Sequence, residues 1–377
     1  MSVIVAFDVG TSGSKVIASF PCPEFPFETV ERHFLVPPAV RELTQSTYED
    51  SLEERYGKSQ FSSSFVSYVD PTSGDRVYWE VGETATRPGL LPVGDRKFEK
   101  CLAKVLSFLG YLVQVEMETN DRVPLCLGLL LPFDEIGDRQ LLARWLRETV
   151  GQFEFNGTAI QNIELESIDC KPEGYGIHKA YDAERVLIVG HSDSSWLCFN
   201  RGALNTKLSC TLPETGMHDF IQTLNFPITY ELRAAELLSL AGPKLNPKYL
   251  FELTQTRSSA EIERLREAIQ QAKRQYWIDR RSEFSSLNVS GVERVPVSGG
   301  AANYFTTELN QMFLELFGIK LHWCKDLMLE FLERFEIQQK TDLLHRFADC
   351  YGYFRDMPGV EGYEAKAVEV VGGAAHA

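Results

Sequence analysis

The feature that most constrains the fold is a strand–turn–strand unit that occurs once in each half of the chain. The first unit has apolar runs at residues 3–7 and 16–20, joined by a turn rich in glycine and serine. The second unit, at residues 185–199, has the same layout, with Gly, Ser and Asp in its turn. Short apolar runs bounded by turn residues are typical of strands. The repeat therefore predicts two related domains that each direct a hairpin toward a shared cleft.

The length and the remaining pattern agree with a two-domain α/β protein. A chain of 377 residues is too long for one core. Apolar residues at helical spacing predict helices, and alternating or continuous apolar runs predict strands. The expected elements are a hairpin at 65–82, helices at 97–112, 137–150 and 261–278, a buried strand at 124–132, and a strand followed by a Gly pair and a helix start at 295–305.

Two segments are expected to lie outside the packed core. Residues 41–58 are polar and charged with few aliphatic side chains, which predicts a surface insertion. The tail from Pro358 onward is small and poorly patterned, so we expect disorder at its end.

Net charge and composition exclude several classes of protein. A net charge of −15 without a block of Lys and Arg predicts repulsion from phosphate backbones, so any action on DNA would need a basic partner. No apolar run reaches eighteen residues and the N-terminus lacks the pattern of a signal peptide, so we expect a cytosolic protein. The eight cysteines are scattered without a C-x-x-C pair, which argues against a cysteine zinc site and a secreted disulfide framework.

The first turn has the residue types of a phosphate-binding loop. Glycines permit backbone N–H groups to converge on an anion, and hydroxyls and a lysine add donors and charge. Asp8 at the strand end could hold Mg²⁺ through water. The candidate phosphate residues are Gly10, Thr11, Ser12, Gly13, Ser14 and Lys15. The alternative is a Gly/Ser turn with a solvated Asp and Lys, and the segment is neither a Walker A loop nor a G-x-G-x-x-G loop.

Two further turns offer similar groups. The second hairpin turn contributes Gly190, Ser192, Asp193 and Ser194, with Asp193 as a second possible metal-side carboxylate. Taken alone, it is more typical of an ordinary hairpin. The third turn contains Gly299, Gly300 and Ala301, where a flat group could approach the backbone at the start of a helix. Taken alone, it indicates only a tight strand-to-helix turn.

Together the three turns resemble the layout of the actin-like ATPases, which is shared by sugar kinases and heat-shock chaperone ATPases. Within this superfamily the chain looks most like the bacterial plasmid-segregation actins, the ParM/StbA family. The resemblance spans nearly the whole chain. It is carried by the second hairpin and by DVGTSGSK (8–15), EVGETA (80–85), KFEKCLAKVL (97–106), KPEGYGI (171–177), GMHDFI (216–221) and SGGAANYF (298–305).

The resemblance implies a fold and its domain limits. It implies an α/β actin-like fold, in which two related domains each have a mixed β-sheet flanked by helices and a nucleotide cleft lies between them. Residues 1–175 and 340–377 would form domain I, including the insertion at 41–58, and residues 176–339 would form domain II.

The resemblance also implies roles for individual residues. Asp8 falls at the magnesium-side aspartate, residues 10–14 surround the β- and γ-phosphates, and Lys15 reaches toward them. Glu173 falls where the family places a glutamate that orients the attacking water, although an acidic residue at a helix N-terminus also favours the helix dipole. Gly299 and Gly300 would contact the adenosine side, with Gly216 beside them.

One position departs from the family pattern. Family members usually have an aspartate where this chain has Gly190. Asp193 matches a position where actins themselves carry an aspartate and is the candidate to take over the metal-side role. His191 is expected to be a merely exposed turn histidine.

The leading functional hypothesis is an ATPase that binds ATP (or GTP) with Mg²⁺ and forms cytomotive filaments. In the family, such filaments push plasmid copies apart through a small basic DNA-binding adaptor, without direct DNA or membrane binding. A small-molecule kinase of the same fold is an alternative, but no general-base carboxylate for it stands out. A second alternative is a nucleotide-binding scaffold with little hydrolysis, which Gly190 favours.

Overall fold

The computed structural model describes residues 1–25, 27–54, 63–85, 97–337 and 343–360, and within them the chain forms three sheets. In the first sheet an antiparallel hairpin continues into parallel strands, with the order β10-β7-β1-β2-β3. The strands are β1 (Val3–Asp8), β2 (Ser14–Pro21), β3 (Thr29–Val36), β7 (Val123–Leu131) and β10 (Ile163–Pro172). The buried run expected at 124–132 is the central strand β7, which is apolar because both its faces are covered.

The second sheet repeats the order of the first. Its hairpin β11–β12 is antiparallel, and β11 then pairs in parallel with β15, which pairs in parallel with β16. The strands are β11 (Arg185–Val189), β12 (Ser194–Asn200), β13 (Ala203–Leu204), β14 (Cys210–Leu212), β15 (Arg294–Ser298) and β16 (Lys320–His322). Two sheets with the same central topology are the structural counterpart of the repeat in the sequence.

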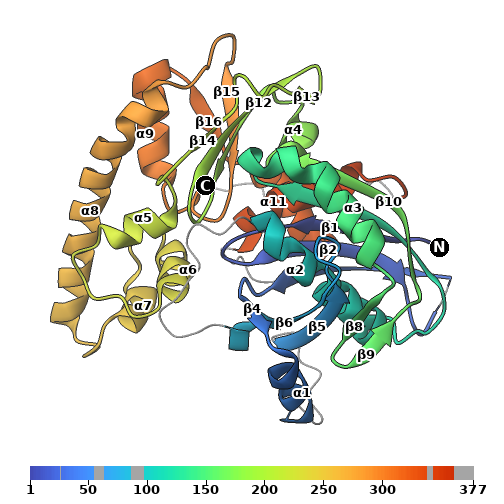
Figure 1. Cartoon of the computed structure of the whole chain (residues 1–377). Coiled ribbons are helices and arrows are strands. Elements are labelled where there is room, and N and C mark those ends of the chain that lie inside the picture. Colours follow the sequence, from blue (N-terminus) through green and yellow to red (C-terminus); the bar gives the residue numbers. More distant parts are fainter. Residues whose placement is uncertain (26, 55–62, 86–96, 338–342, 361–377) are drawn as a thin grey trace, which may run out of the picture.

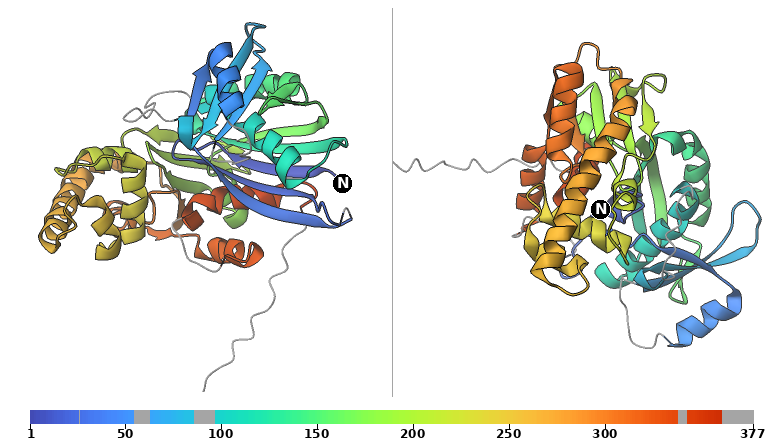
Figure 2. Two further views of the ribbon diagram at one scale, coloured as in Figure 1. Left: turned by 90° about the horizontal axis from the view of Figure 1, so that it is seen from below. Right: turned by 90° about the vertical axis from the view of Figure 1, so that its left-hand side faces the viewer.

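The third sheet is antiparallel and has the order β4-β6-β5-β8-β9. Its strands are β4 (Val40–Leu43), β5 (Ser63–Val69), β6 (Arg76–Gly82), β8 (Phe153–Phe155) and β9 (Thr158–Ile160). Helix α1 (Gln45–Glu54) follows β4 and projects from the molecule (Figure 2). The segment expected as a polar insertion thus begins as a strand of this sheet and continues as an exposed helix, and residues 55–58 lie outside the described range.

Helices flank the sheets. On the side of the first sheet lie α2 (Lys97–Tyr111) and α3 (Arg139–Thr149), whereas α5 (Met217–Gln222), α6 (Glu231–Ala241), α7 (Pro247–Leu250), α8 (Ser259–Ser285) and α9 (Thr306–Phe317) accompany the second sheet (Figure 1). The expected helices at 97–112, 137–150 and 261–278 correspond to α2, α3 and α8. Helix α8 continues to residue 285, and α9 begins at residue 306, after a longer turn than the sequence suggested.

Two helices lie between the larger sheets. They are α4 (Tyr175–Tyr181) and α11 (Leu343–Asp356), and α11 contacts α4, β1, β2 and β15, while α10 (Lys325–Arg334) packs on its outer side. Apolar side chains from both sheets and from α11 form one buried cluster here, separate from the clusters under each sheet. The turns at the ends of β1, β11 and β15 are therefore held around a common pair of helices.

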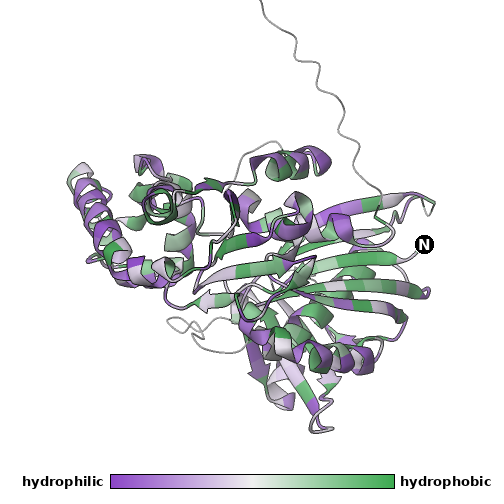
Figure 3. Ribbon diagram, turned by 90° about the horizontal axis from the view of Figure 1, so that it is seen from above, coloured by the Kyte–Doolittle hydropathy of each residue, from purple (hydrophilic) through white to green (hydrophobic). Residues whose placement is uncertain are grey.

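The hydropathy of the elements follows this arrangement. Strands β1, β2 and β7 of the first sheet are mainly hydrophobic, whereas α8 contains many hydrophilic residues (Figure 3). Among the described residues no helix combines the length and the apolar character that crossing a membrane requires.

The proposed domain limits stay predictions, and both the boundary at 339/340 and the tail beyond residue 360 lie outside the described residues.

Candidate functional site

The first turn is closed by an ion pair across the base of the β1–β2 hairpin. Asp8 and Lys15 are opposite residues in the ladder, and Lys15 Nζ lies 2.7 Å from Asp8 Oδ2. Asp8 is only 5% exposed. A Cβ atom at Gly10 would lie 2.4 Å from the carbonyl oxygen of Gly13, so this chain reversal is too tight for any residue but glycine.

Two polar atoms of this turn are buried and have no hydrogen-bond partner among the described residues. They are Asp8 Oδ1 and Ser14 Oγ. A buried carboxylate oxygen without a partner carries a desolvation cost that a bound cation or its water can offset. Mg²⁺ prefers oxygen ligands and keeps several waters, so the residues present fit the expected ion.

Three cationic side chains surround the turn. Besides Lys15, the buried Lys104 of α2 places Nζ 3.5 Å from the Gly10 carbonyl oxygen. Arg346 of α11 donates from Nη2 to the Ser12 carbonyl oxygen at 2.8 Å and to Ser12 Oγ at 3.2 Å. Thr11 is partly exposed at the tip. Cationic side chains that lie close to backbone and hydroxyl donors form a site suited to an anionic ligand. This local positive charge contrasts with the net charge of −15 of the whole chain.

Two further acidic residues, Glu173 and Asp349, lie in the region of Asp8. Asp349 of α11 is buried and accepts hydrogen bonds from the backbone N–H of Gly174 at 2.5 Å and of Ile177 at 3.1 Å. Burial raises the pKa of Asp349 to about 7, and the charges of Asp8 and Glu173 add to the rise despite the opposing N–H bonds. Asp8 and Glu173 are therefore close enough to Asp349 to act on the same region.

Glu173 lies at the junction of β10 and α4. Its backbone N–H donates to the Leu131 carbonyl oxygen at 2.7 Å, which fixes the chain just before α4, and its side chain is partly buried. The charge of Glu173 contributes to the raised pKa of Asp349, so its carboxylate lies in the same region as Asp349.

The second turn is closed mainly by backbone. The Gly190 N–H donates to the Asp193 carbonyl oxygen at 2.9 Å, and the Gly216 N–H donates to the Ser192 carbonyl oxygen at 3.1 Å. Asp193 Oδ1 accepts from the Glu214 N–H at 3.2 Å. Ser194 is buried and bonded to Thr215 through its backbone N–H and its hydroxyl, at 2.9 and 3.2 Å.

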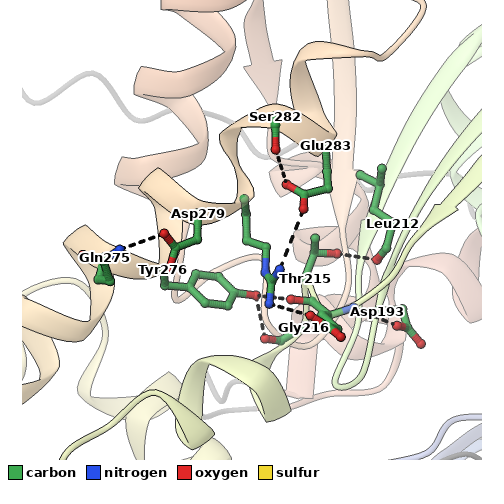
Figure 4. Close-up of polar contacts among 11 residues, drawn as sticks. Asp193, Leu212, Thr215, Gly216, Gln275, Tyr276, Asp279, Ser282 and Glu283 are labelled. Carbon is green, nitrogen blue, oxygen red and sulfur yellow. Dashed lines mark hydrogen bonds and ion pairs between the residues drawn. The ribbon is translucent and has the colours of Figure 1, made fainter.

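Helix α8 supports the loop that follows the second turn. The Tyr276 hydroxyl points at this loop and donates to the carbonyl oxygens of Gly216 at 3.0 Å and Glu214 at 3.3 Å (Figure 4). Arg280 donates to Glu214 Oε2 at 2.8 Å. The Gly216 loop is thus held against the second turn, and the role of Gly216 beside the adenosine stays a prediction.

The third turn contacts both of the others. The Ala301 N–H donates to the Val189 carbonyl oxygen at 3.1 Å, next to the second turn. Gly300 packs against the side chain of Arg346, which reaches the first turn, and the Gly299 N–H donates to the His345 carbonyl oxygen at 3.3 Å. The structure therefore gathers the three predicted turns around the start of α11.

Sequence reasoning missed Lys104, Arg346 and Asp349. Lys104 could have been found, because it lies near Cys101 and Val105 on the apolar side of a helix, where a lysine is unusual. Arg346 and Asp349 carry no such signal, since they reach the site only through the placement of α11 by long-range packing.

A groove of about 400 Å³ lies elsewhere, between α8 and α9. Its lining includes Lys273, Trp277 and Glu308 but no residue of the three turns. We assign the candidate site to the turns, where cationic side chains meet a tight glycine turn and an unpartnered Asp8 oxygen.

Comparison with known proteins identifies the fold. Bacillus thuringiensis ParM solved with ATP aligns over 93% of this chain and 97% of its own, with a TM-score of 0.55 and 14% identity. The AlfA filament from B. subtilis plasmid pLS32 aligns over 94% and 99%, with a TM-score of 0.50 and 11% identity. The chain has the actin-like fold. The archaeal actin homologue Ta0583 also aligns over 94% and 100%, with a TM-score of 0.51 and 18% identity.

The actin-like fold confirms the architecture predicted from the repeated hairpins. No protein-family model matches this actin-like chain, and no curated protein sequence matches it either. Among the similar structures, the Bacillus thuringiensis ParM was solved with ATP and with AMPPNP.

Proposed function

We propose that this actin-like chain binds ATP, or GTP, with Mg²⁺ between its two halves and assembles into filaments that segregate plasmid DNA. The observation that carries the proposal is the first turn, where Lys15, Lys104 and Arg346 surround a glycine turn that contains an unpartnered Asp8 oxygen. Similarity to ParM solved with ATP and to the AlfA filament supports the nucleotide and the assembly.

Each residue of the first turn would have a defined task. The backbone and hydroxyls of residues 10–14 would donate to the β- and γ-phosphates, and Lys15 and Arg346 would neutralise their charge. Asp8 would hold Mg²⁺ through water, together with Asp193 from the second turn. The ion, when bound, would supply positive charge on the phosphate oxygens.

Glu173 would orient the attacking water. Phosphoryl transfer to water depends on positioning and charge neutralisation more than on covalent help, so a fixed carboxylate beside the phosphate turn is sufficient. Gly216, Gly299, Gly300 and Ala301 would face the adenosine, with Gly190, Ser192 and Ser194 on its phosphate side.

Arg346 gives a physical route from nucleotide to conformation. Its side chain touches the first turn, on one sheet, and packs on Gly300, at the end of the other sheet. A ligand that binds both turns would favour the arrangement in which they are close, and this closed subunit would add to the filament. Hydrolysis would remove the γ-phosphate contacts and loosen the filament.

The chain itself would carry no DNA-binding function. Its net charge of −15 favours a small basic adaptor as the link to the plasmid. We propose that the chain acts in the cytoplasm, where plasmid DNA is segregated.

A second candidate function is a nucleotide-binding scaffold with little turnover. It is favoured by Gly190, which supplies no carboxylate, and by Asp193, whose Oδ1 already accepts a backbone N–H. This protein would bind nucleotide and assemble without rapid phosphate release.

The test is light scattering after addition of Mg²⁺ and ATP, with phosphate release followed in the same sample and the product imaged by negative-stain microscopy. Filaments whose scattering decays as phosphate appears would support the first proposal. Stable filaments without phosphate release would support the scaffold. A flat trace with nucleotide bound would contradict assembly, and phosphorylation of an added sugar would indicate a kinase.

A further inference from the structure

Three side chains that the nucleotide proposal does not use meet at one point behind the second turn. His191 belongs to the turn between β11 and β12, His218 to the first turn of α5, and Glu231 is the first residue of α6. Their candidate ligand atoms all lie within 4.8 Å of one another. The three residues are spread over 41 positions of the sequence, so no local motif marked them.

The two histidines converge on a single carboxylate oxygen. His191 Nε2 lies 2.9 Å and His218 Nδ1 lies 2.7 Å from Glu231 Oε1. Gln222 Nε2 donates to the other carboxylate oxygen, Oε2, at 3.2 Å. Gln222 therefore orients the Glu231 carboxylate so that Oε1 faces the two imidazoles.

The backbone holds the two histidines together. The His218 N–H donates to the His191 carbonyl oxygen at 2.7 Å, and the imidazole centroids are 6.2 Å apart. The side chains of His191, Glu231 and His218 are 8%, 15% and 19% exposed, so the cluster is sheltered yet reachable from solvent. A pre-formed set of donors loses little conformational entropy when a ligand binds.

Glu231 stays ionised in this setting. The imidazoles of His191 and His218 hydrogen-bond to its carboxylate, which favours the charged form. The position at the N-terminus of α6 also favours a negative charge. The cluster thus offers one carboxylate oxygen and two imidazole nitrogens.

Two imidazoles and one carboxylate are a donor set for a transition metal. Zn²⁺ bound to two His and one Glu keeps a fourth position for water, whereas Mg²⁺ selects oxygen ligands. Metal–nitrogen bonds of about 2.0–2.1 Å place tetrahedral ligand atoms about 3.3 Å apart, so each imidazole nitrogen would move away from Glu231 Oε1 by about 0.5 Å. The hydrogen-bonded cluster therefore already holds the three side chains that would bind the metal.

We propose that His191, His218 and Glu231 form a zinc site that ties the β11–β12 turn to α5 and α6. The site is separate from the groups that would hold Mg²⁺ at the first turn, and it does not depend on the nucleotide proposal. Zinc would fix the second turn by linking three elements that are otherwise joined by hydrogen bonds. Release of protons from the imidazoles makes its affinity pH-dependent.

The experiment is calorimetric titration of the full chain with ZnCl₂ at pH 7.5, after removal of metals with EDTA and in the presence of excess Mg²⁺. We expect one Zn²⁺ per chain. Binding should weaken markedly at pH 5.5, because protons compete with the metal for the imidazole nitrogens. Cobalt replacing zinc should give the visible absorption of a four-coordinate site.

Variants locate the site. Glu231→Gln and His218→Ala should each weaken zinc binding by more than about 100-fold, because loss of a direct ligand exceeds the about 10- to 100-fold cost of losing an outer partner. Gln222→Ala tests that outer partner and should cost less. The matched control is Glu236→Gln on the same helix, whose carboxylate pairs with Arg233, and it should bind zinc as the wild type does.

Either of two results would overturn the proposal. The wild-type chain could fail to bind Zn²⁺ at micromolar concentration, in which case the cluster is a hydrogen-bond network only. Alternatively, zinc binding could survive in both ligand variants, which would place the metal elsewhere. The wild-type titration and the cobalt spectrum decide the first question even if a variant does not fold.

Discussion

The β1–β2 turn and the β11–β12 turn occupy equivalent places in two sheets of the same strand order, but they are built from different groups. The first has a buried ion pair between Asp8 and Lys15, an unpartnered carboxylate oxygen and two further cations nearby. The second begins with Gly190 directly after β11, and its hydrogen bonds run mainly from backbone to backbone.

The difference indicates that the two halves of the chain contribute different kinds of group to the candidate site. Charged groups that face a ligand cost stability when they are left unpaired, so they are expected where chemistry requires them. The first turn contains such a group, the unpartnered oxygen of Asp8, whereas the second turn is closed by hydrogen bonds between its own backbone groups. A Cβ atom at Gly190 would lie 2.7 Å from the Asp193 carbonyl oxygen, so even an alanine would strain the second turn.

The largest effect is expected from Asp8→Asn, which removes the charge of the first turn with little change in shape. Loss of one preorganised charged group typically lowers turnover by about 100- to 1,000-fold, and we expect phosphate release to fall by at least about 100-fold. Phosphate release at saturating Mg²⁺ and ATP measures this. A variant that is folded by circular dichroism and turns over within about threefold of wild type would remove Asp8 from the site.

The next effect is expected from Arg346→Ala, which breaks the link between the first and third turns. Hydrogen bonds to charged groups contribute about 1.5–3 kcal/mol, so nucleotide affinity should fall by about 10- to 100-fold. Titration with a fluorescent nucleotide measures the affinity.

The control for Arg346→Ala is Arg355→Ala on the same helix. Arg355 pairs with Glu330 at 2.8 Å near the surface, and such pairs contribute at most about 1 kcal/mol. Equal affinity in the two variants would mean that Arg346 does not contact the ligand.

A smaller effect is expected from Asp193→Asn. The amide oxygen can still accept the Glu214 N–H that holds the second turn, so the fold should be kept. Because the second turn would supply only part of the metal-side charge, we expect turnover to fall less than about 10-fold, well below the effect of Asp8→Asn. A loss of turnover as large as that of Asp8→Asn would show that the two turns contribute equally to the metal-side charge, which would contradict a difference between them.

The same two turns show what a single sequence can reveal. Both hairpins were predictable, because apolar runs around Gly- and Ser-rich turns are local patterns, and the repeat of that pattern pointed to two related sheets. Asp8, Lys15 and the glycines of the first turn were found in the same way. These residues lie within eight positions of one another, so the local sequence contains the whole turn.

Groups that depend on long-range packing were not predictable. Arg346 and Asp349 belong to the last described helix and reach the first turn from more than 330 positions away. The contact between His191 and Glu231 likewise depends on how α6 packs on the second sheet. His191 was expected to be a merely exposed turn residue, but its side chain is 8% exposed and bonded to Glu231.

The carboxyl of Asp349 is expected to affect the pH dependence of stability. The pKa of Asp349 is raised to about 7, chiefly by burial, against an ordinary value of 3.8. Between these values the folded chain keeps a proton that the unfolded chain has released. The contribution of Asp349 to stability should therefore fall as pH rises from about 4 to about 7 and stay constant above that, with each pKa unit equal to about 1.4 kcal/mol.

Urea unfolding of wild type and Asp349→Asn between pH 5 and pH 8 measures this contribution. The substitution disturbs one of the two backbone hydrogen bonds at every pH, so the slope is compared and not the absolute stability. The wild type should lose stability relative to the variant as pH rises. Asp8→Asn removes a charge that raises the pKa of Asp349. In that variant the fall of stability with rising pH should therefore end at a lower pH than in the wild type. Parallel curves for wild type and Asp349→Asn would show that the Asp349 carboxyl is already ionised in the folded chain.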